Sequence, residues 1–200
     1  MTPRFRIVVA ASFLTVSGVA EAQQRPAAPA PAPAAPAQPA PGAGLPRQLG
    51  AYDGWIAVEA GAGATRVCYL VGRPTKSESK PANARRGEIT LTVAHYPGAN
   101  RTNEVTWVAG YPLRDNGPME IEVGRVKVPL SNLNQPNSEK AWTRDEVGNR
   151  QAIDAMRQAQ SGNALVRGIS GRGTETTDHF ALAGFARGLA DIDKACNVRR

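Results

Sequence analysis

Residues 25–47 form a stretch of proline and alanine that divides the chain and limits what it can fold into. Eight of the sixteen prolines fall between Pro26 and Pro46. Alanine offers little side chain to bury, and proline removes a backbone donor and fixes φ, so this stretch cannot build a core. We therefore expect residues 23–48 to form a disordered linker, partly polyproline II. Folding is then confined to one domain, residues 49–200.

The residues before this linker have the pattern of an export signal. Two arginines precede an apolar run that ends at Ala20, and Ala20 and Ala22 are the small residues that a signal peptidase reads. We expect residues 1–22 to be a signal peptide, cleaved between Ala22 and Gln23. The apolar run is too short to cross a bilayer comfortably, which takes about 20 residues. We therefore expect no transmembrane segment in the mature chain. The alternative to a signal peptide is a buried N-terminal helix.

The chain is basic, with a formal net charge of +7 at pH 7. Such a charge favours anionic surfaces, such as a glycan or the headgroups of a lipid surface, although solubility alone also explains it. The basic residues are scattered, and Arg85-Arg86 and Arg199-Arg200 are doublets rather than a cluster. This pattern does not indicate nucleic-acid binding.

The domain begins with short segments typical of β-strands. They are rich in β-branched and aromatic residues and are separated by turn signals. The expected strands are 55–58, 66–71, 88–96, 104–111, 119–123, 126–130 and 165–169. Gly124-Arg125 fits a type II′ hairpin, and Pro129 suggests that the second arm is an edge strand. We predict a mostly β fold, a β-sandwich or open barrel of about seven strands.

Two helices are expected in the second half of the domain. Thr143 and Glu146 have the spacing of a capping box, which predicts a helix up to about Gln160. A final helix is expected over 184–195, because apolar residues recur there at helical spacing. The stripes expected to face the core are Ala152, Ile153, Met156 and Ala159 in the first helix, and Phe185, Leu189, Ile192 and Cys196 in the second.

The chain contains two cysteines, Cys68 and Cys196. An even number in an exported chain predicts a disulfide, with two separate thiols as the alternative. The bridge would pin the C-terminal helix to an early strand and close a loop of roughly 130 residues. The chain-entropy model gives such a cross-link slightly more than about 4.7 kcal/mol.

The sequence has no pattern typical of catalysis or metal binding. Its two histidines are His95 and His179, there is no GxSxG motif, and no Cys or His spacing fits a metal site. His179 follows Asp178, but neighbours on a strand point to opposite faces. We predict a protein that is not an enzyme, with no cofactor or metal. Candidate binding residues are His95, Arg172, Asp178 and His179, and a structural role is the alternative for each.

Short motifs also occur in a defined order over residues 52–196. They are Trp55, Val67-Cys68-Tyr69-Leu70, Asn103-Glu104-Val105, Gly110-Tyr111-Pro112, Ala141-Trp142, 168–174, Asp178, 182–185 and 192–196. In their order and spacing the chain resembles the invasion-associated locus B family of exported alphaproteobacterial proteins. The resemblance implies an exported, mostly β domain, associated in some pathogens with entry into host cells. It implies no catalytic residues.

These observations predict a non-enzymatic protein of the cell envelope, in the periplasm or on the outer cell surface. It would bind an unknown envelope or host-surface component and contribute to host-cell invasion or to envelope integrity. The alternative is an enzyme or a carbohydrate-binding module that acts on cell-wall material. That alternative would draw on His95, Asp178, His179 and the turn Gly171–Gly173.

Overall fold

The computed structural model describes residues 44–133 and 135–200, which form eleven β-strands, two α-helices and two 3-10 helices. The strands are β1 (Arg47–Tyr52), β2 (Trp55–Ala60), β3 (Val67–Gly72), β4 (Lys76–Lys80), β5 (Thr90–Tyr96), β6 (Arg101–Val108), β7 (Glu120–Val123), β8 (Val126–Ser131), β9 (Lys140–Thr143), β10 (Asn163–Ile169) and β11 (Glu175–Ala181). The helices are η1 (Gly63–Thr65), η2 (Pro97–Ala99), α1 (Glu146–Ala159) and α2 (Phe185–Cys196). The expected signal peptide, its cleavage site at Ala22 and Gln23, and the linker up to residue 43 lie outside the described residues.

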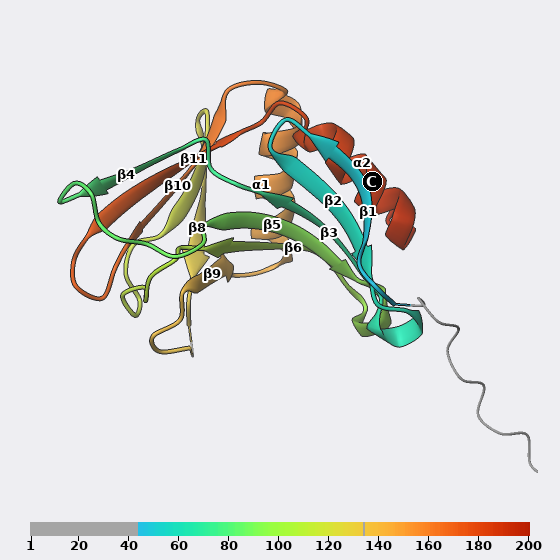
Figure 1. The fold of residues 1–200 in the computed structure, drawn as a ribbon, viewed down its shortest axis with the longest axis horizontal. Coiled ribbons are helices and arrows are strands. Elements are labelled where there is room, and N and C mark those ends of the chain that lie inside the picture. Colours follow the sequence, from blue (N-terminus) through green and yellow to red (C-terminus); the bar gives the residue numbers. More distant parts are fainter. Residues whose placement is uncertain (1–43, 134) are drawn as a thin grey trace, which may run out of the picture. The chain divides into compact units, whose positions relative to one another are not determined.

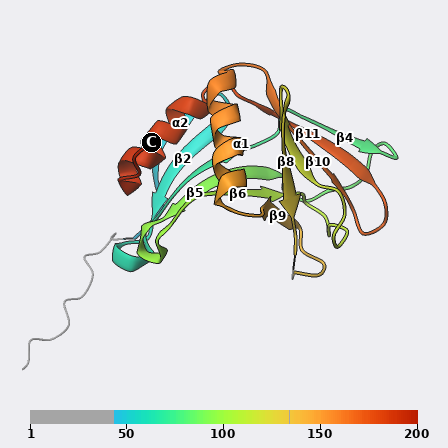
Figure 2. The same ribbon diagram turned by 180° about the vertical axis from the view of Figure 1, so that it is seen from behind.

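All eleven strands belong to one antiparallel sheet, in the order β1-β2-β3-β5-β6-β9-β8-β7-β10-β11-β4. The sheet is strongly bent (Figures 1 and 2). We call β1, β2, β3, β5, β6 and β9 the first limb, and β8, β7, β10, β11 and β4 the second limb. The bend brings the inner faces of the two limbs together. The contact is seen where the indole of Trp107 in β6 donates to Asp178 in β11. Helix α2 packs against β1, β2, β3 and β5 of the first limb, whereas α1 packs across both limbs, against β6 and β9 and against β7 and β8.

Aromatic side chains fill the space between the limbs. Trp55 is 2% exposed, and Trp107 and Phe180 are fully buried. The Trp55 ring meets Phe185 of α2 edge to face, with 5.0 Å between ring centroids, a geometry that stabilises aromatic pairs. Its indole nitrogen also donates to the carbonyl of Ala181, at 2.6 Å. The core therefore joins β2, β6, β11 and α2.

Helix α1 begins two residues later than a capping box at Thr143 requires. Thr143 is the last residue of β9, pairs with Leu130 and is buried, so it cannot cap a helix. Asp145 takes that role, because its carboxylate accepts from the backbone N–H of Gly148 at 2.8 Å. The predicted cap was therefore wrong. Of the predicted inward residues, Ala152, Ile153 and Met156 are buried as expected, and Ala159 is partly buried against the core.

Helix α2 is joined covalently to the first limb. Cys196 at its end and Cys68 in β3 form a disulfide with an S–S distance of 2.00 Å, which confirms the predicted bridge. The expected inward stripe is also confirmed: Phe185, Leu189 and Ile192 are buried. At Gly188 the helix lies so close to β3 that an added Cβ would come within 2.4 Å of Leu70. A larger residue there would push the helix off the sheet.

The predicted fold class is confirmed in its main features: a mostly β domain with two helices, the second pinned by one disulfide. The sheet has four strands that the sequence pattern did not mark, β1, β4, β9 and β11. β1 begins at Arg47, two residues before the expected start of the domain. Pro129 does not mark an edge strand, because β8 pairs with β7 on one side and, at Leu130 and Ser131, with β9 on the other.

Candidate functional site

The four candidate binding residues do not lie together. His95 is in β5 on the first limb, and Arg172 is exposed in the turn between β10 and β11. Asp178 and His179 are neighbours in β11 and point to opposite faces, so Asp178 is fully buried while His179 is half-buried. Each must therefore be considered in its own surroundings.

His95 has a structural role at the C-terminal end of α2. It is fully buried, its Nδ1 accepts from the backbone N–H of Asn103 at 3.0 Å, and its Nε2 lies 2.9 Å from Asp193. Because the backbone amide can only donate, Nδ1 carries no proton and the neutral ring donates from Nε2 to Asp193. Burial raises the pKa of Asp193, but hydrogen bonds from His95 and Arg200 outweigh it and hold the pKa below its usual value.

His179 belongs to a charged cluster on the outer face of the second limb. Its Nε2 lies 3.0 Å from Glu78 in β4, and Glu78 also pairs with Lys76 at 2.7 Å. The hydrogen bonds from Lys76 and then from His179 hold the pKa of Glu78 below its usual value. This is a solvated cluster, and it does not reach Asp178 on the other face of β11.

Asp178 forms a buried ion pair with Arg86, a residue that sequence reasoning missed. Nη1 and Nη2 of Arg86 donate to the two carboxylate oxygens at 2.6 and 2.7 Å, in the two-pronged geometry that arginine favours. The side chain of Arg86 is 7% exposed and that of Asp178 is fully buried. Trp107 adds a third hydrogen bond to the carboxylate at 3.1 Å. The pair joins the loop after β4 to β11 and β6.

The rest of the Arg86 guanidinium is also held in place. Nε and Nη2 both donate to the carbonyl of Ala109, at 2.9 and 2.8 Å, and the group lies 5.0 Å from the ring centre of Tyr111. Tyr111 is bonded to Thr176 of β11 at 2.6 Å, and burial raises the pKa of its hydroxyl. Arg86 therefore has a fixed position. In the sequence, its only sign was the Arg85-Arg86 doublet.

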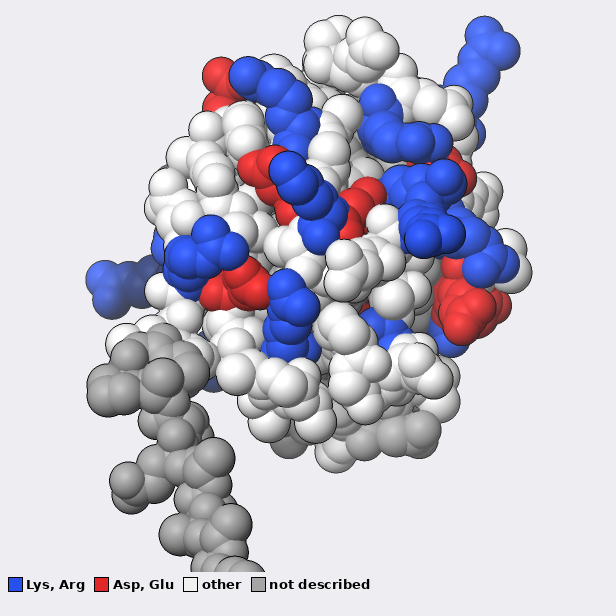
Figure 3. All heavy atoms as spheres, turned by 90° about the vertical axis from the view of Figure 1, so that its right-hand side faces the viewer, with Lys and Arg blue, Asp and Glu red and all other residues white. Residues whose placement is uncertain are grey.

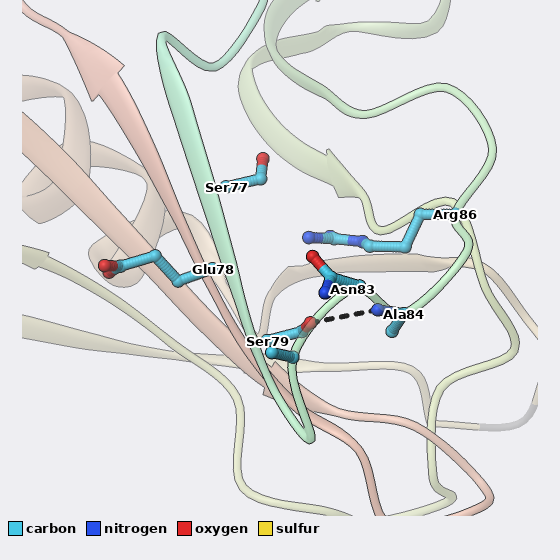
Figure 4. A pocket seen from close by; sticks show the side chains of 7 residues that line it. Ser77, Glu78, Ser79, Asn83, Ala84 and Arg86 are labelled. Atoms are coloured by element: carbon cyan, nitrogen blue, oxygen red, sulfur yellow. Dashed lines mark hydrogen bonds between the residues drawn. The ribbon is translucent and has the colours of Figure 1, made fainter.

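A polar cavity of about 360 Å³ lies beside Arg86, between β4 and the segment that follows it (Figure 4). It is lined by Ser77, Glu78, Ser79, Ala82, Asn83, Ala84 and Arg86. In Figure 4 the guanidinium of Arg86 extends toward β4, next to the Asn83 side chain, while Glu78 points to the other side of the strand. The Ser79 hydroxyl accepts from the backbone N–H of Ala84 at 3.2 Å and closes the turn. The cavity offers hydroxyl, amide and guanidinium groups.

The surface around α2 carries both signs of charge. Figure 3 shows blue and red side chains next to one another on this side of the molecule. Arg187 of α2 pairs with Asp53 at 2.8 Å, and Arg47 of β1 pairs with Glu59 at 2.5 Å. Intermixed charges of this kind do not sum to a strong field of one sign.

The described residues form one small polar pocket beside the buried Arg86–Asp178 pair. They contain no group of three or more His, Cys, Asp and Glu side chains that could hold a metal ion. None of the helices within residues 44–133 and 135–200 is long and apolar enough to cross a membrane. No family model, no curated protein and no solved structure matches the chain. The fold and the cavity thus define a disulfide-linked β domain with a small polar pocket.

Proposed function

We propose that this chain is an exported, non-enzymatic protein of the cell envelope that binds a partner. The observation that carries the proposal is the Cys68–Cys196 disulfide. Such bonds persist in oxidising compartments, which in bacteria means the periplasm and the cell surface. The signal-like pattern of residues 1–22 supports the same location from an independent part of the chain.

Binding rather than catalysis is supported by how the polar side chains are used. His95 is bonded to Asn103 and Asp193, and Asp178 is bonded to Arg86 and Trp107, so neither is available as a general base. His95 lies in β5 of the first limb, whereas Asp178 and the Gly171–Gly173 turn belong to the second limb. This separation argues against the enzymatic alternative. The alternative to the proposal was an enzyme or a carbohydrate-binding module. Of these two, the polar cavity beside Arg86 favours the carbohydrate-binding module.

The proposed partner is a component of the envelope or of a host surface, such as an anionic glycan or a lipid surface. The resemblance to invasion-associated locus B proteins supports a contribution to host-cell invasion or to envelope integrity. These two roles differ in location, because contact with a host cell requires the domain on the outer surface.

The test is cell fractionation and protease shaving of intact cells that carry a C-terminally tagged chain. Mass spectrometry of the purified chain should show an N-terminus at Gln23 and two cysteines that resist alkylation without reductant. A Cys68→Ser, Cys196→Ser chain is the control for the alkylation step. A cytoplasmic chain with an intact N-terminus and free thiols would overturn the proposal.

The shaving step distinguishes the two roles. Loss of the tag, while a periplasmic marker survives, supports host contact at the surface. Protection of both the tag and the marker supports a role in envelope integrity.

A further inference from the structure

We propose that the cavity between β4 and residues 82–86 binds one uncharged sugar residue of a glycan, through Ser77, Asn83 and Arg86. The inference rests on the proposed partner-binding function and deepens it by naming the class of ligand. Three observations carry it: an unused donor on a buried arginine, the charge balance of the cavity, and its size.

The first observation is a count of the donors on Arg86. A guanidinium has five N–H groups. Nε uses its one N–H on Ala109, Nη2 uses its two on Ala109 and Asp178, and Nη1 uses one on Asp178. The second N–H of Nη1 has no partner among the described residues. Because the other four bonds fix the group, this N–H can bind an acceptor with little loss of side-chain entropy.

The second observation is the balance of charge. Asp178 accepts from both Nη atoms of Arg86, so the buried pair is neutral as a unit and has no excess positive charge to hold a phosphate or a carboxylate. The carboxylate of Glu78 points away from the cavity (Figure 4) and is bonded to Lys76 and His179. The cavity therefore favours a neutral ligand over an anion.

The remaining groups match a sugar in hydrogen-bonding character. The Ser77 hydroxyl and the Asn83 amide can each donate and accept, and neither has a side-chain partner among the described residues. Both residues are exposed, so these groups are open to a ligand. Sugar hydroxyls likewise donate and accept, and the N–H of Arg86 supplies a further donor. A ligand with several hydroxyls on one ring can use all three residues at once.

The third observation is size. A volume of about 360 Å³ is near the lower end of the range for small-molecule sites, roughly 300–1,000 Å³. It suits one ring rather than a long oligosaccharide. Ala82 and Asn83 at the rim are exposed, so a glycan chain can continue into solvent. No aromatic side chain lines the cavity, so the ring has no stacking partner and we expect weak binding, with a Kd of about 1 mM.

The experiment is an NMR titration of the full chain, purified with its disulfide intact. The probes are the methyl glycosides of glucose, galactose, mannose and N-acetylglucosamine, with sodium phosphate as the anionic probe. We expect at least one glycoside to shift the amide signals of residues 77–86 in a saturable way. Ser77→Ala and Asn83→Ala should each weaken binding about fivefold, as expected for loss of one hydrogen bond. Lys76→Gln, on the same strand but not among the residues that line the cavity, should leave Kd unchanged.

Three results would overturn the inference. They are the absence of binding by every glycoside, tighter binding of phosphate than of any glycoside, and unchanged affinity in both the Ser77→Ala and the Asn83→Ala chains. Ser77 and Asn83 are both exposed, and the spectrum itself reports folding. Asn83 has a positive φ of 61°, so Asn83→Gly is measured beside Asn83→Ala to separate loss of the amide from backbone strain. A negative titration with an exported, disulfide-bonded chain would reject the sugar site alone. A cytoplasmic, reduced chain would instead reject the proposed function.

Discussion

Two regions of the domain fasten a segment of chain to the bent sheet by different means. At the α2 end, the Cys68–Cys196 disulfide joins the last helix to β3, and Arg66 donates to the carbonyl of Ala195. At the β4 end, the Arg86–Asp178 pair joins the loop after β4 to β11 without a covalent bond. The first attachment acts largely on the unfolded chain, which it constrains. The second acts in the folded chain, where each buried charge is stabilised by the opposite charge of its partner.

The two attachments therefore have different roles. The disulfide mainly stabilises the domain, whereas the ion pair positions a side chain in the cavity. The disulfide lies away from the cavity, whereas Arg86 is both half of the ion pair and part of the cavity wall. A buried ion pair often stabilises a fold no more than apolar residues of the same volume would. The Arg86–Asp178 pair therefore explains the position of a polar group better than it explains the stability of the domain.

The largest expected effect is at the α2 end. Replacing both cysteines by serine should lower the free energy of unfolding by up to about 5 kcal/mol, because the bridge spans 128 positions of sequence. Urea denaturation of the oxidised chain, the reduced chain and the double variant measures the change. The reduced chain and the variant should agree. A loss below about 1 kcal/mol would show that this end does not depend on the bridge.

At the β4 end, Asp178→Asn should cost about 3–5 kcal/mol, because Arg86 would remain charged and buried without its counter-ion. The same denaturation experiment measures the loss. The double variant Arg86→Met, Asp178→Leu sharpens the comparison, since it removes both charges and should be more stable than Asp178→Asn. It should remain less stable than the unaltered chain, because the carbonyl of Ala109 and the indole N–H of Trp107 lose their partners. If the double variant is as unstable as Asp178→Asn, the unpaired charge is not the main cause of the loss.

Asn149 of α1 lies between the two ends and should have an intermediate effect. Its side-chain oxygen accepts from the buried backbone N–H of Val105 at 2.9 Å and from the hydroxyl of Thr143. Asn149→Ala leaves that N–H without a partner, at a cost of about 1–3 kcal/mol. Thermal unfolding measures it, with Arg150→Ala on the exposed side of α1 as the control. Equal Tm values for the two variants would contradict this expectation.

The smallest effect is the pH dependence at the α2 end. The folded pKa of Asp193 lies below its ordinary value of 3.8, so its stabilising contribution is present above that value and is lost as the pH falls through the folded pKa. We expect Asp193→Asn to lose less stability than the unaltered chain as the pH falls from about 5 to about 2. Urea midpoints across this range measure the two slopes. Parallel slopes would mean that Asp193 does not contribute to the acid sensitivity.

Much of the α2 end could be predicted from the sequence because its signals are local or unique. Two cysteines permit one intramolecular pairing, and the spacing of Phe185, Leu189 and Ile192 is that of a helix face. In the same way, alternating apolar residues marked β5. The N-cap of α1 was missed because Thr143 and Asp145 both precede Glu146, and threonine and aspartate are both residue types that favour the N-cap position. Only the pairing of Thr143 with Leu130 in the sheet decides between them.

The β4 end could not be predicted because its signals are distant or absent. The strand reads Lys-Ser-Glu-Ser-Lys, with no apolar residue, because Ser77 and Ser79 line a polar cavity and the other side chains face solvent. Arg86 is 92 positions from Asp178, and nothing local distinguishes it from Arg85, which is exposed. A site built from such residues becomes visible only once the strand order is known.

The position of β4 in the sheet also sets a time order for building the cavity. Thr75, just before β4, bonds to His179, which is 104 positions later in the chain. Wherever the chain folds, β4 therefore has no partner strand until β11 is available to pair with it. Closing so long a loop is slow compared with forming a local hairpin. The cavity is thus completed only when β11 has joined the sheet, and a chain interrupted before β11 would lack Asp178, which holds Arg86 in the cavity wall.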